Sequence, residues 1–213
     1  MSDFSVKYEV SVILTVYNRE FYLQRSINSL INQNFSNWEL IAIDDGSTDN
    51  SLSVLRSYEE DFPNIKILHQ ENQRIAQSRN RGIFISKGKY ITFLDSDDEY
   101  EKSHLLKRVE FLNDHPEVDL LYGGVKIIGN QFVRDKDNPQ SYIHLSNCFI
   151  GGTFFGKRKI FVELDGFKDI EYSEDSDLII RAKDKFNVRK FDHSTYIYHR
   201  ELSDSLTNSY VPK

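Results

Sequence analysis

The sequence of 213 residues predicts an α/β protein whose mostly parallel sheet is flanked by helices. Short apolar segments alternate with amphipathic segments throughout the first half of the chain. The apolar segments are rich in Val and Ile and lack polar alternation, which is typical of strands buried on both faces. Acidic clusters directly follow two of these segments. In parallel sheets, ligands bind at the carboxyl ends of the strands, so the clusters indicate a site there.

The predicted strands of the first half are 8–18, 38–43, 65–68 and 90–94. Helices are predicted after each of them. Asn18 and Ser103 are expected to cap two of these helices, and Asp49 precedes a third. Gly88 is expected to end the helix over 75–86 as its C-cap.

The second half, from Pro116 onward, is less regular. Short strands are predicted on both sides of Gly123-Gly124 and at 151–156, and another strand is expected directly before the segment 196–201. Helices are predicted at 157–164 and after the segment 172–177, whose acidic residues favour a helix start.

Composition excludes several classes of protein. A net charge of −6 argues against general affinity for nucleic acid, which needs a basic face. The single cysteine, Cys148, excludes an internal disulfide framework and a cysteine zinc site, and it fits a reducing compartment. Apolar runs stay shorter than the ~18 residues of a membrane-spanning helix. We therefore expect a cytoplasmic protein with no transmembrane segment.

The densest acidic cluster lies in TFLDSDDEY, residues 92–100. Like charges so close together repel, and a cation would relieve that repulsion. Carboxylate oxygens suit Mg²⁺ or Mn²⁺, which commonly share their site with substrate phosphates. The alternative is that these acids favour the start of the next helix, which we accept for Glu99 and Glu101.

Arg79 lies on the same predicted helix face as Ile75 and Ile83, which are four residues away on either side. A guanidinium beside an apolar face needs a partner. That partner is either an acid within the fold or a phosphate of a ligand, and both interpretations stay open.

Five segments, in order and at suitable spacing, resemble motifs of the non-processive bacterial family 2 glycosyltransferases, which have the GT-A fold with its Rossmann-like sheet. They are SVILTVYNRE (11–20), WELIAIDDGSTDNS (38–51), ENQRIAQSRNRGI (71–83), GKYITFLDSDDEY (88–100) and SEDSDLIIRA (173–182). The resemblance extends from about Val10 to Leu206. It implies one domain, 1–213, with a nucleotide-binding half at about 8–115 and a smaller, mixed acceptor-side half at about 116–206.

The resemblance also implies roles on the donor side. Val16 and Tyr17 would line the nucleotide pocket, and Asp44 would bond the edge of the base. Arg79 would lie near the base or the diphosphate. One departure is that the family's usual glycine after Asn72 is missing, because Gln73 and Arg74 follow.

By the same resemblance, Asp95 would approach the ribose, and Ser96 belongs to the same donor-binding set. Asp97 would bind the divalent metal that bridges the two phosphates, with Asp98 as a second candidate. His199 is a candidate for an additional metal ligand, and a packed histidine is the alternative.

On the acceptor side, the resemblance implies that Asp175 is the general base, with Glu174 beside it. Plain capping of a helix is the alternative for both. We expect Asp175 to keep an ordinary pKa, with the helix dipole keeping it ionised. Residues 151–153 would form a wall of the acceptor site.

The function expected from the resemblance is an inverting, metal-dependent transfer of one sugar. The donor would be a nucleotide-diphosphate sugar, UDP-linked by preference, and the cofactor Mn²⁺ or Mg²⁺. The acceptor would be a glycan or lipid-linked molecule of surface polysaccharide synthesis. Peripheral contact with the inner face of a membrane is compatible with such an acceptor. The chain lacks the Q-x-x-R-W motif of processive members.

Two other classes stay open from sequence. The first is a sugar-nucleotide-binding module that has lost catalysis. The second is a phosphoacceptor signalling domain, because Asp44-Asp45 and Asp95 stand at predicted strand ends. The Glu174-Asp175 pair has no place in that second class.

Overall fold

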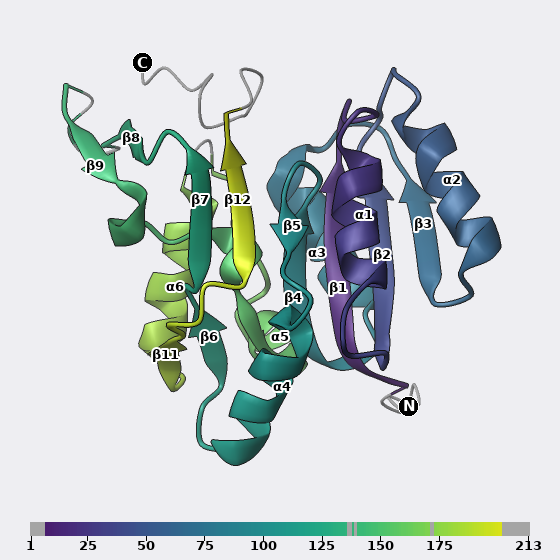
Figure 1. The fold of residues 1–213 in the computed structure, drawn as a ribbon. Coiled ribbons are helices and arrows are strands. Elements are labelled where there is room, and N and C mark those ends of the chain that lie inside the picture. The colour runs from purple at the N-terminus through teal and green to yellow at the C-terminus, as the bar shows by residue number, and fades with distance from the viewer. Residues whose placement is uncertain (1–6, 136–137, 139, 171–172, 202–213) are drawn as a thin grey trace.

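The computed structural model describes residues 7–135, 138, 140–170 and 173–201. A seven-stranded sheet with the order β11-β6-β10-β4-β1-β2-β3 runs through this part of the chain (Figure 1). Only β10 of this sheet is antiparallel to its neighbours. The strands are β1 Tyr8–Val16, β2 Trp38–Asp44, β3 Ile65–His69, β4 Gly88–Asp95, β6 Leu120–Tyr122, β10 Phe155–Lys157 and β11 Val188–Lys190. The predicted α/β class is confirmed.

Two smaller sheets complete the described strands. In the first, β12 (Tyr196–Arg200) lies between β5 (Glu99–Tyr100) and β7 (Val125–Gly129). It is antiparallel to β5, so that the chain near residue 197 pairs with the end of the acidic cluster. The second sheet is the hairpin of β8 (Phe132–Arg134) and β9 (Tyr142–His144).

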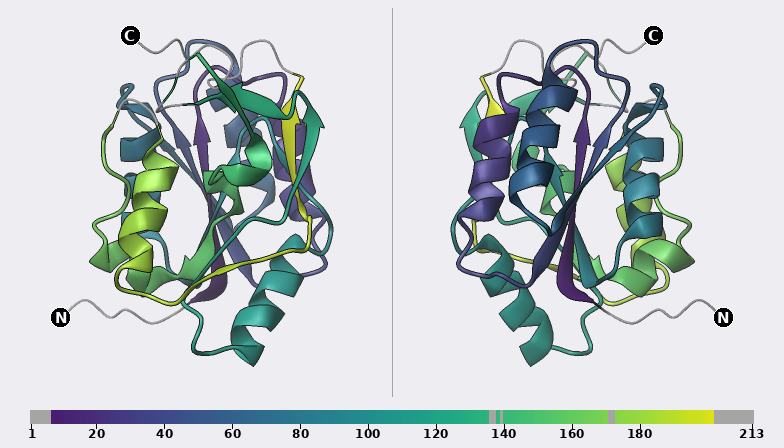
Figure 2. Two further views of the ribbon diagram at one scale, coloured as in Figure 1. Left: turned by 90° about the vertical axis from the view of Figure 1, so that its left-hand side faces the viewer. Right: turned by 90° about the vertical axis from the view of Figure 1, so that its right-hand side faces the viewer.

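Helices cover both faces of the large sheet, as the edge-on views of Figure 2 show. Alternate side chains of β1 point to opposite faces, so that Val12 and Leu14 join one core cluster and Ile13 joins the other. The first cluster packs under α1, α2 and α4, and the second under α3, α5 and α6. The helices are α1 Leu23–Ile31, α2 Ser51–Asp61, α3 Arg74–Ile85, α4 His104–Asp114, α5 Arg158–Glu163 and α6 Glu174–Lys183, with 3-10 turns η1 Leu145–Asn147 and η2 Gly151–Thr153.

Three local predictions were wrong. Asn18 does not cap a helix: its φ is 52° and its side-chain oxygen accepts the Thr48 N–H at 2.8 Å, while α1 begins only at Leu23. Gly88 opens β4 rather than ending α3, because its N–H donates to the Ser11 hydroxyl at 2.8 Å. The segment 151–156 is not one strand, since a 3-10 turn precedes β10.

Within the described ranges, none of the helices has both the length and the apolar character needed to cross a bilayer. The C-terminal residues after 201, where the resemblance to the family ends, lie outside the described residues.

Candidate active site

The two acidic clusters meet at one edge of the large sheet. In the register of the parallel strands, β1 lies between β2 and β4, with Val16 opposite Asp44 and Thr15 opposite Asp95. The carboxyl ends of β2 and β4 therefore lie on either side of the end of β1. This is the edge at which open α/β sheets bind ligands, as the sequence predicted.

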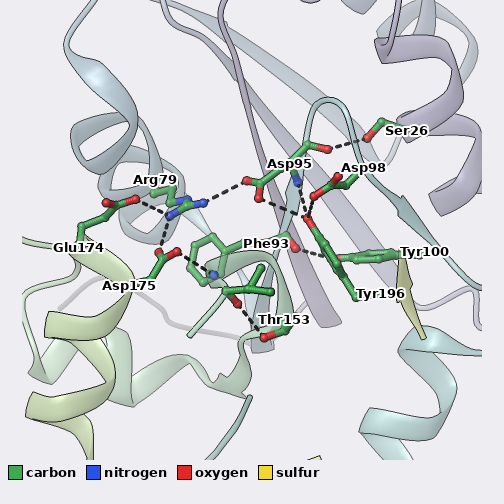
Figure 3. Close-up of polar contacts among 12 residues, drawn as sticks. Ser26, Arg79, Phe93, Asp95, Asp98, Tyr100, Thr153, Glu174, Asp175 and Tyr196 are labelled. Carbon is green, nitrogen blue, oxygen red and sulfur yellow. Dashed lines mark hydrogen bonds and ion pairs between the residues drawn. The ribbon is translucent and has the colours of Figure 1, made fainter. Parts of the chain in front are cut away.

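Arg79 lies at the centre of the site and joins three elements (Figure 3). From α3, its guanidinium bonds Asp95 at the end of β4 at 3.0 Å, and Glu174 and Asp175 at the start of α6 at 3.2 and 2.8 Å. The Arg79 side chain is 3% exposed. The sequence left open whether the partner of Arg79 is an acid of the fold or a phosphate of a ligand. In the described residues, Arg79 pairs with three acids of the fold.

Burial alone would lower the pKa of Arg79, but the charges of Asp175, Asp95 and Glu174 raise it above its ordinary value. The guanidinium also lies over two aromatic rings, with its carbon 5.7 Å from the centre of the Phe93 ring and 5.1 Å from that of Phe167. Arg79 is therefore a fixed cation. Three carboxylates surround its single charge, which leaves an excess of negative charge at this edge.

Asp175 is held at both carboxylate oxygens. Oδ1 accepts from Arg79 and Oδ2 accepts the Gly151 N–H at 2.8 Å. Burial, with the added charge of Glu174, raises the pKa of Asp175 to about 7 although Arg79 opposes the shift. The expectation of an ordinary pKa is not met, because burial and the charge of Glu174 outweigh the opposing effects of Arg79 and of the Gly151 hydrogen bond. A carboxyl group with a pKa near 7 suits proton transfer at neutral pH.

Gly151 allows this approach because it has no side chain. A Cβ at this position would lie 2.3 Å from Asp175 Oδ1 and 2.9 Å from Arg79 Nη1. The next residue is also restricted, since a Cβ on Gly152 would lie 2.1 Å from the Tyr196 hydroxyl oxygen. The turn η2 thus fits against the site only with two glycines.

Asp98 faces inward. Its two oxygens accept from the Tyr196 hydroxyl at 2.7 Å and from the His199 N–H at 2.8 Å, and the residue is fully buried. Burial, followed by the charges of Asp95 and Asp97, raises the pKa of Asp98 well above its ordinary value. The Asp97 side chain keeps 17% of its surface exposed, and one of its oxygens lies 3.7 Å from Arg19 Nε. Asp97 is therefore the more accessible of the two candidate metal ligands.

The structure gives no support to the predicted ligand role of His199. Its two ring nitrogens lie 2.7 Å from carboxylate oxygens of Glu99 and Glu201, so both are already engaged. Throughout the part of the chain that the structure describes, no three His, Cys, Asp or Glu side chains group into a metal site of their own.

The end of β2 contains a partly satisfied carboxylate. Asp44 is fully buried, and its Oδ2 lies 2.7 Å from His69 Nδ1. Its Oδ1 is buried and has no partner among the described residues. Nearby Tyr17 is 48% exposed, whereas Val16 and Ser96 are buried. Asp44 thus has a buried acceptor oxygen without a partner among the described residues, and the exposed ring of Tyr17 follows the neighbouring end of β1.

Sequence reasoning missed the hydrogen-bond partners of Asp45 and the role of Tyr196. Asp45 Oδ1 accepts from the Gln70 side chain at 2.7 Å and from the Gln73 N–H at 2.9 Å, which ties the loop before α3 to the end of β2. Tyr196 was noted only within the segment 196–201, which was expected to follow a strand, and had no role assigned. Its distance of 98 residues from Asp98 along the chain leaves no local pattern by which to find it.

Arg74 occupies the position of the family's missing glycine in a left-handed conformation, with φ of 70°. Glycine adopts this conformation freely, whereas a residue with a Cβ is strained there. The departure noted in the sequence thus places a side chain in a backbone conformation that favours glycine.

A pocket of about 330 Å³ lies beside η2. Its walls include Gly123 and Gly124, Phe149, Ile150 and Thr153, with Lys190 and Asp192 as charged groups. Ile150 and Thr153 flank the two glycines that contact Asp175 and Tyr196. The pocket therefore combines aromatic and hydrogen-bonding side chains beside the turn that contacts Asp175.

Comparisons with known proteins agree with this architecture. Residues 11–170 match the family described as Glycosyl transferase family 2. The chain is 33% identical over 183 residues to the minor teichoic acid biosynthesis protein GgaA of Bacillus subtilis, covering 78% of this chain and 41% of GgaA. It is 38% identical over 104 residues to the putative teichuronic acid biosynthesis glycosyltransferase TuaG of the same organism, covering 48% and 41%.

Among solved structures, TarS 1-349 of S. aureus in complex with UDP-GlcNAc has a TM-score of 0.77 at 22% identity, covering 95% of this chain and 62% of that one. The mannosyltransferase PcManGT of Pyrobaculum calidifontis, in complex with GDP-Man and Mn²⁺, has a TM-score of 0.71 at 21% identity, covering 92% and 58%. These likenesses confirm the predicted GT-A fold. The chain spans less than half the length of GgaA and TuaG.

The family match covers most of the chain and includes Arg79 and Asp95. The chain belongs to glycosyl transferase family 2.

Proposed function

We propose that this chain binds a nucleotide-diphosphate sugar and transfers its sugar, with inversion, to a hydroxyl of a glycan or lipid-linked acceptor. One observation carries the proposal: the buried Arg79 brings Asp95, at the donor-side strand end, and Asp175, at the start of α6, onto the same guanidinium. A donor-binding acid and a base with a pKa of about 7 are therefore neighbours.

A UDP-linked donor is preferred. The unpartnered oxygen of Asp44 and the exposed ring of Tyr17 suit hydrogen bonding and stacking with a base. A UDP-GlcNAc complex of TarS supports a UDP sugar, and the GDP-Man complex of PcManGT supports a guanine base as the alternative.

The acidic residues fit a divalent cation. Asp95, Asp97 and Asp98 offer hard oxygens, and their mutual repulsion contributes to the raised pKa of Asp98. A Mg²⁺ or Mn²⁺ ion held by one or two carboxylates and by the phosphates of the donor needs no cluster of three protein ligands. Asp97 would hold it, because its side chain is the more accessible of the two, whereas Asp98 is fully buried. Once bound, the cation would stabilise charge on the leaving diphosphate.

Asp175 would act as the general base. The acceptor hydroxyl attacks the anomeric carbon from the side opposite the diphosphate, and Asp175 takes its proton. The bond from the anomeric carbon to the phosphate oxygen breaks, and its electrons leave with the diphosphate. Attack from the opposite side inverts the anomeric centre. Arg79 and the Gly151 N–H fix the orientation of the base, and Glu174 raises its pKa.

The pocket beside η2 is the proposed acceptor site, with Phe149 and Thr153 among its walls. Its aromatic and hydrogen-bonding lining suits a sugar unit. The names of GgaA and TuaG support a role in cell-surface polymer synthesis. Peripheral contact with the cytoplasmic face of a membrane is part of the proposal, because lipid-linked acceptors lie there.

Thermal stabilisation tests the donor site. We expect UDP to raise the melting temperature of the wild-type protein only with Mn²⁺, because binding to the native state alone stabilises it. Asp97→Asn should abolish that shift. Asp192→Asn, in the pocket beside η2, is the control and should keep it. No shift with UDP or GDP, with or without Mn²⁺, would refute the proposal. A shift without turnover of any acceptor would favour the inactive binding module.

A further inference from the structure

The hydroxyl of Tyr196 links the two acids at the end of β4. It donates to Asp98 Oδ2 at 2.7 Å and lies 3.3 Å from Asp95 Oδ2. The backbone N–H of Asp95 also points at this hydroxyl oxygen, at 3.3 Å. Figure 3 shows Asp95 and Asp98 converging on the tip of the Tyr196 side chain. One hydroxyl group therefore contacts both acids that flank the candidate metal ligand Asp97.

Tyr196 is held rigidly. Its side chain is fully buried and packs edge-to-face on Tyr100, with ring centres 5.8 Å apart. On its other side, Gly152 makes room for the hydroxyl, because a Cβ there would lie 2.1 Å from the oxygen. The backbone of β12 fixes the same acid again through the His199 N–H, which donates to Asp98 Oδ1. Asp98 therefore has little freedom to turn toward a ligand.

We propose that Tyr196 is a positioning residue that sets the carboxylates of Asp95 and Asp98, and thereby the shape of the 95–98 loop that receives the donor and its cation. It acts through these acids and does not touch the ligand. Removing the hydroxyl leaves the buried Asp98 Oδ2 without this hydrogen bond, so its loss should release Asp98 from this orientation. This inference rests on the proposed function, since it assigns the loop to donor binding.

The experiment compares Tyr196→Phe with Tyr100→Phe. Both variants remove one buried hydroxyl and keep the ring. The Tyr100 hydroxyl donates to the Phe93 carbonyl oxygen at 2.7 Å and contacts neither acid, which makes it a matched control. Calorimetric titration with UDP in the presence of MnCl₂ gives the dissociation constant, and thermal melting gives the stability of each variant.

We expect Tyr196→Phe to raise the dissociation constant of UDP with Mn²⁺ about tenfold, the effect of one lost hydrogen bond of about 1.4 kcal/mol. Tyr100→Phe should lower the melting temperature to a similar extent but keep the wild-type affinity. Wild-type affinity in Tyr196→Phe, or equal losses of affinity in both variants, would overturn the inference.

Crystal structures of the two variants without ligand separate this inference from the proposed function. The carboxylates of Asp95 and Asp98 should change orientation in Tyr196→Phe and stay in place in Tyr100→Phe. Unmoved carboxylates in Tyr196→Phe would refute the positioning role whether or not the protein binds UDP. Failure of the wild-type protein to bind UDP or GDP would refute the proposed function alone.

Discussion

At the scale of single residues, Asp175 controls the expected pH dependence. Its pKa of about 7 in the folded protein lies above the ordinary value of 3.8. A base must be ionised to accept a proton, so kcat/KM should rise with pH through about 7 and then level off. A pH profile of sugar transfer checks this. A plateau that already begins near pH 5 would contradict it.

The same shift links Asp175 to stability. A raised pKa in the folded state means that the protonated group stabilises the fold, and that this contribution is lost as pH rises from about 4 to about 7. Asp175→Asn should therefore match the wild-type free energy of unfolding at pH 4. At pH 8 it should exceed the wild-type value by about 4 kcal/mol, while transfer falls about 10²–10⁴-fold. Urea unfolding at both pH values measures this, and Asp192→Asn is the control.

Arg74 allows a test of backbone strain. Because its φ is 70°, Arg74→Gly should relieve the clash of the Cβ and raise the free energy of unfolding by up to about 1 kcal/mol. The neighbouring exposed residue Gln77 lies within α3, so Gln77→Gly should lower the same quantity by about 1 kcal/mol. Chemical unfolding of both variants measures the contrast, and equal destabilisation would contradict the strain.

At the scale of elements, the turn η2 should tolerate no side chain at its first residue. In Gly151→Ala the new Cβ would collide with Asp175 and Arg79, so stability should fall by about 1–3 kcal/mol and transfer should fall as well. Gly156→Ala is the control. Its Cβ would meet the side chain of Leu120, in β6, at 2.7 Å, and would meet neither Asp175 nor Arg79. It should lose stability while the remaining folded protein keeps its kcat. Turnover per folded molecule distinguishes the two.

The elements also show what a sequence can reveal. The apolar runs of β1, β2 and β4 and the acids after β2 and β4 are local patterns, so their positions were predicted correctly. Gly88 opens β4 and donates a hydrogen bond to Ser11, 77 residues away. No local pattern in the sequence encodes this contact. The same holds for Tyr196 and His199, whose partners are set by the pairing of β12 with β5. The features that could not be predicted therefore depend on contacts between residues far apart in the sequence.

At the scale of the whole molecule, Arg79 connects the two halves of the chain. It extends from α3 to α6 and binds acids of both. Arg79→Met keeps much of the contact with Phe93 and Phe167 but leaves three carboxylates without their cation. We expect a loss of about 3–5 kcal/mol of stability, as for other broken buried pairs. Arg56→Met, which breaks an exposed pair with Glu59, should cost less than about 1 kcal/mol.

Calorimetric melting compares these two arginine variants. Similar melting temperatures for both would show that the buried cluster adds nothing to cohesion between the halves. We also expect Arg79→Met to lose less stability at pH 5 than at pH 8, because protonation of Asp175 removes one of the uncompensated charges.

The hydrogen bond from Gly151 to Asp175 has a consequence for spectroscopy. The amide proton of Gly151 points at a carboxylate oxygen 2.8 Å from its nitrogen. Its NMR chemical shift should therefore follow the charge of Asp175, moving as that carboxyl group gains or loses a proton. A titration of a ¹⁵N-labelled sample would then record the ionisation of the base in the resting protein, with neither donor nor acceptor present.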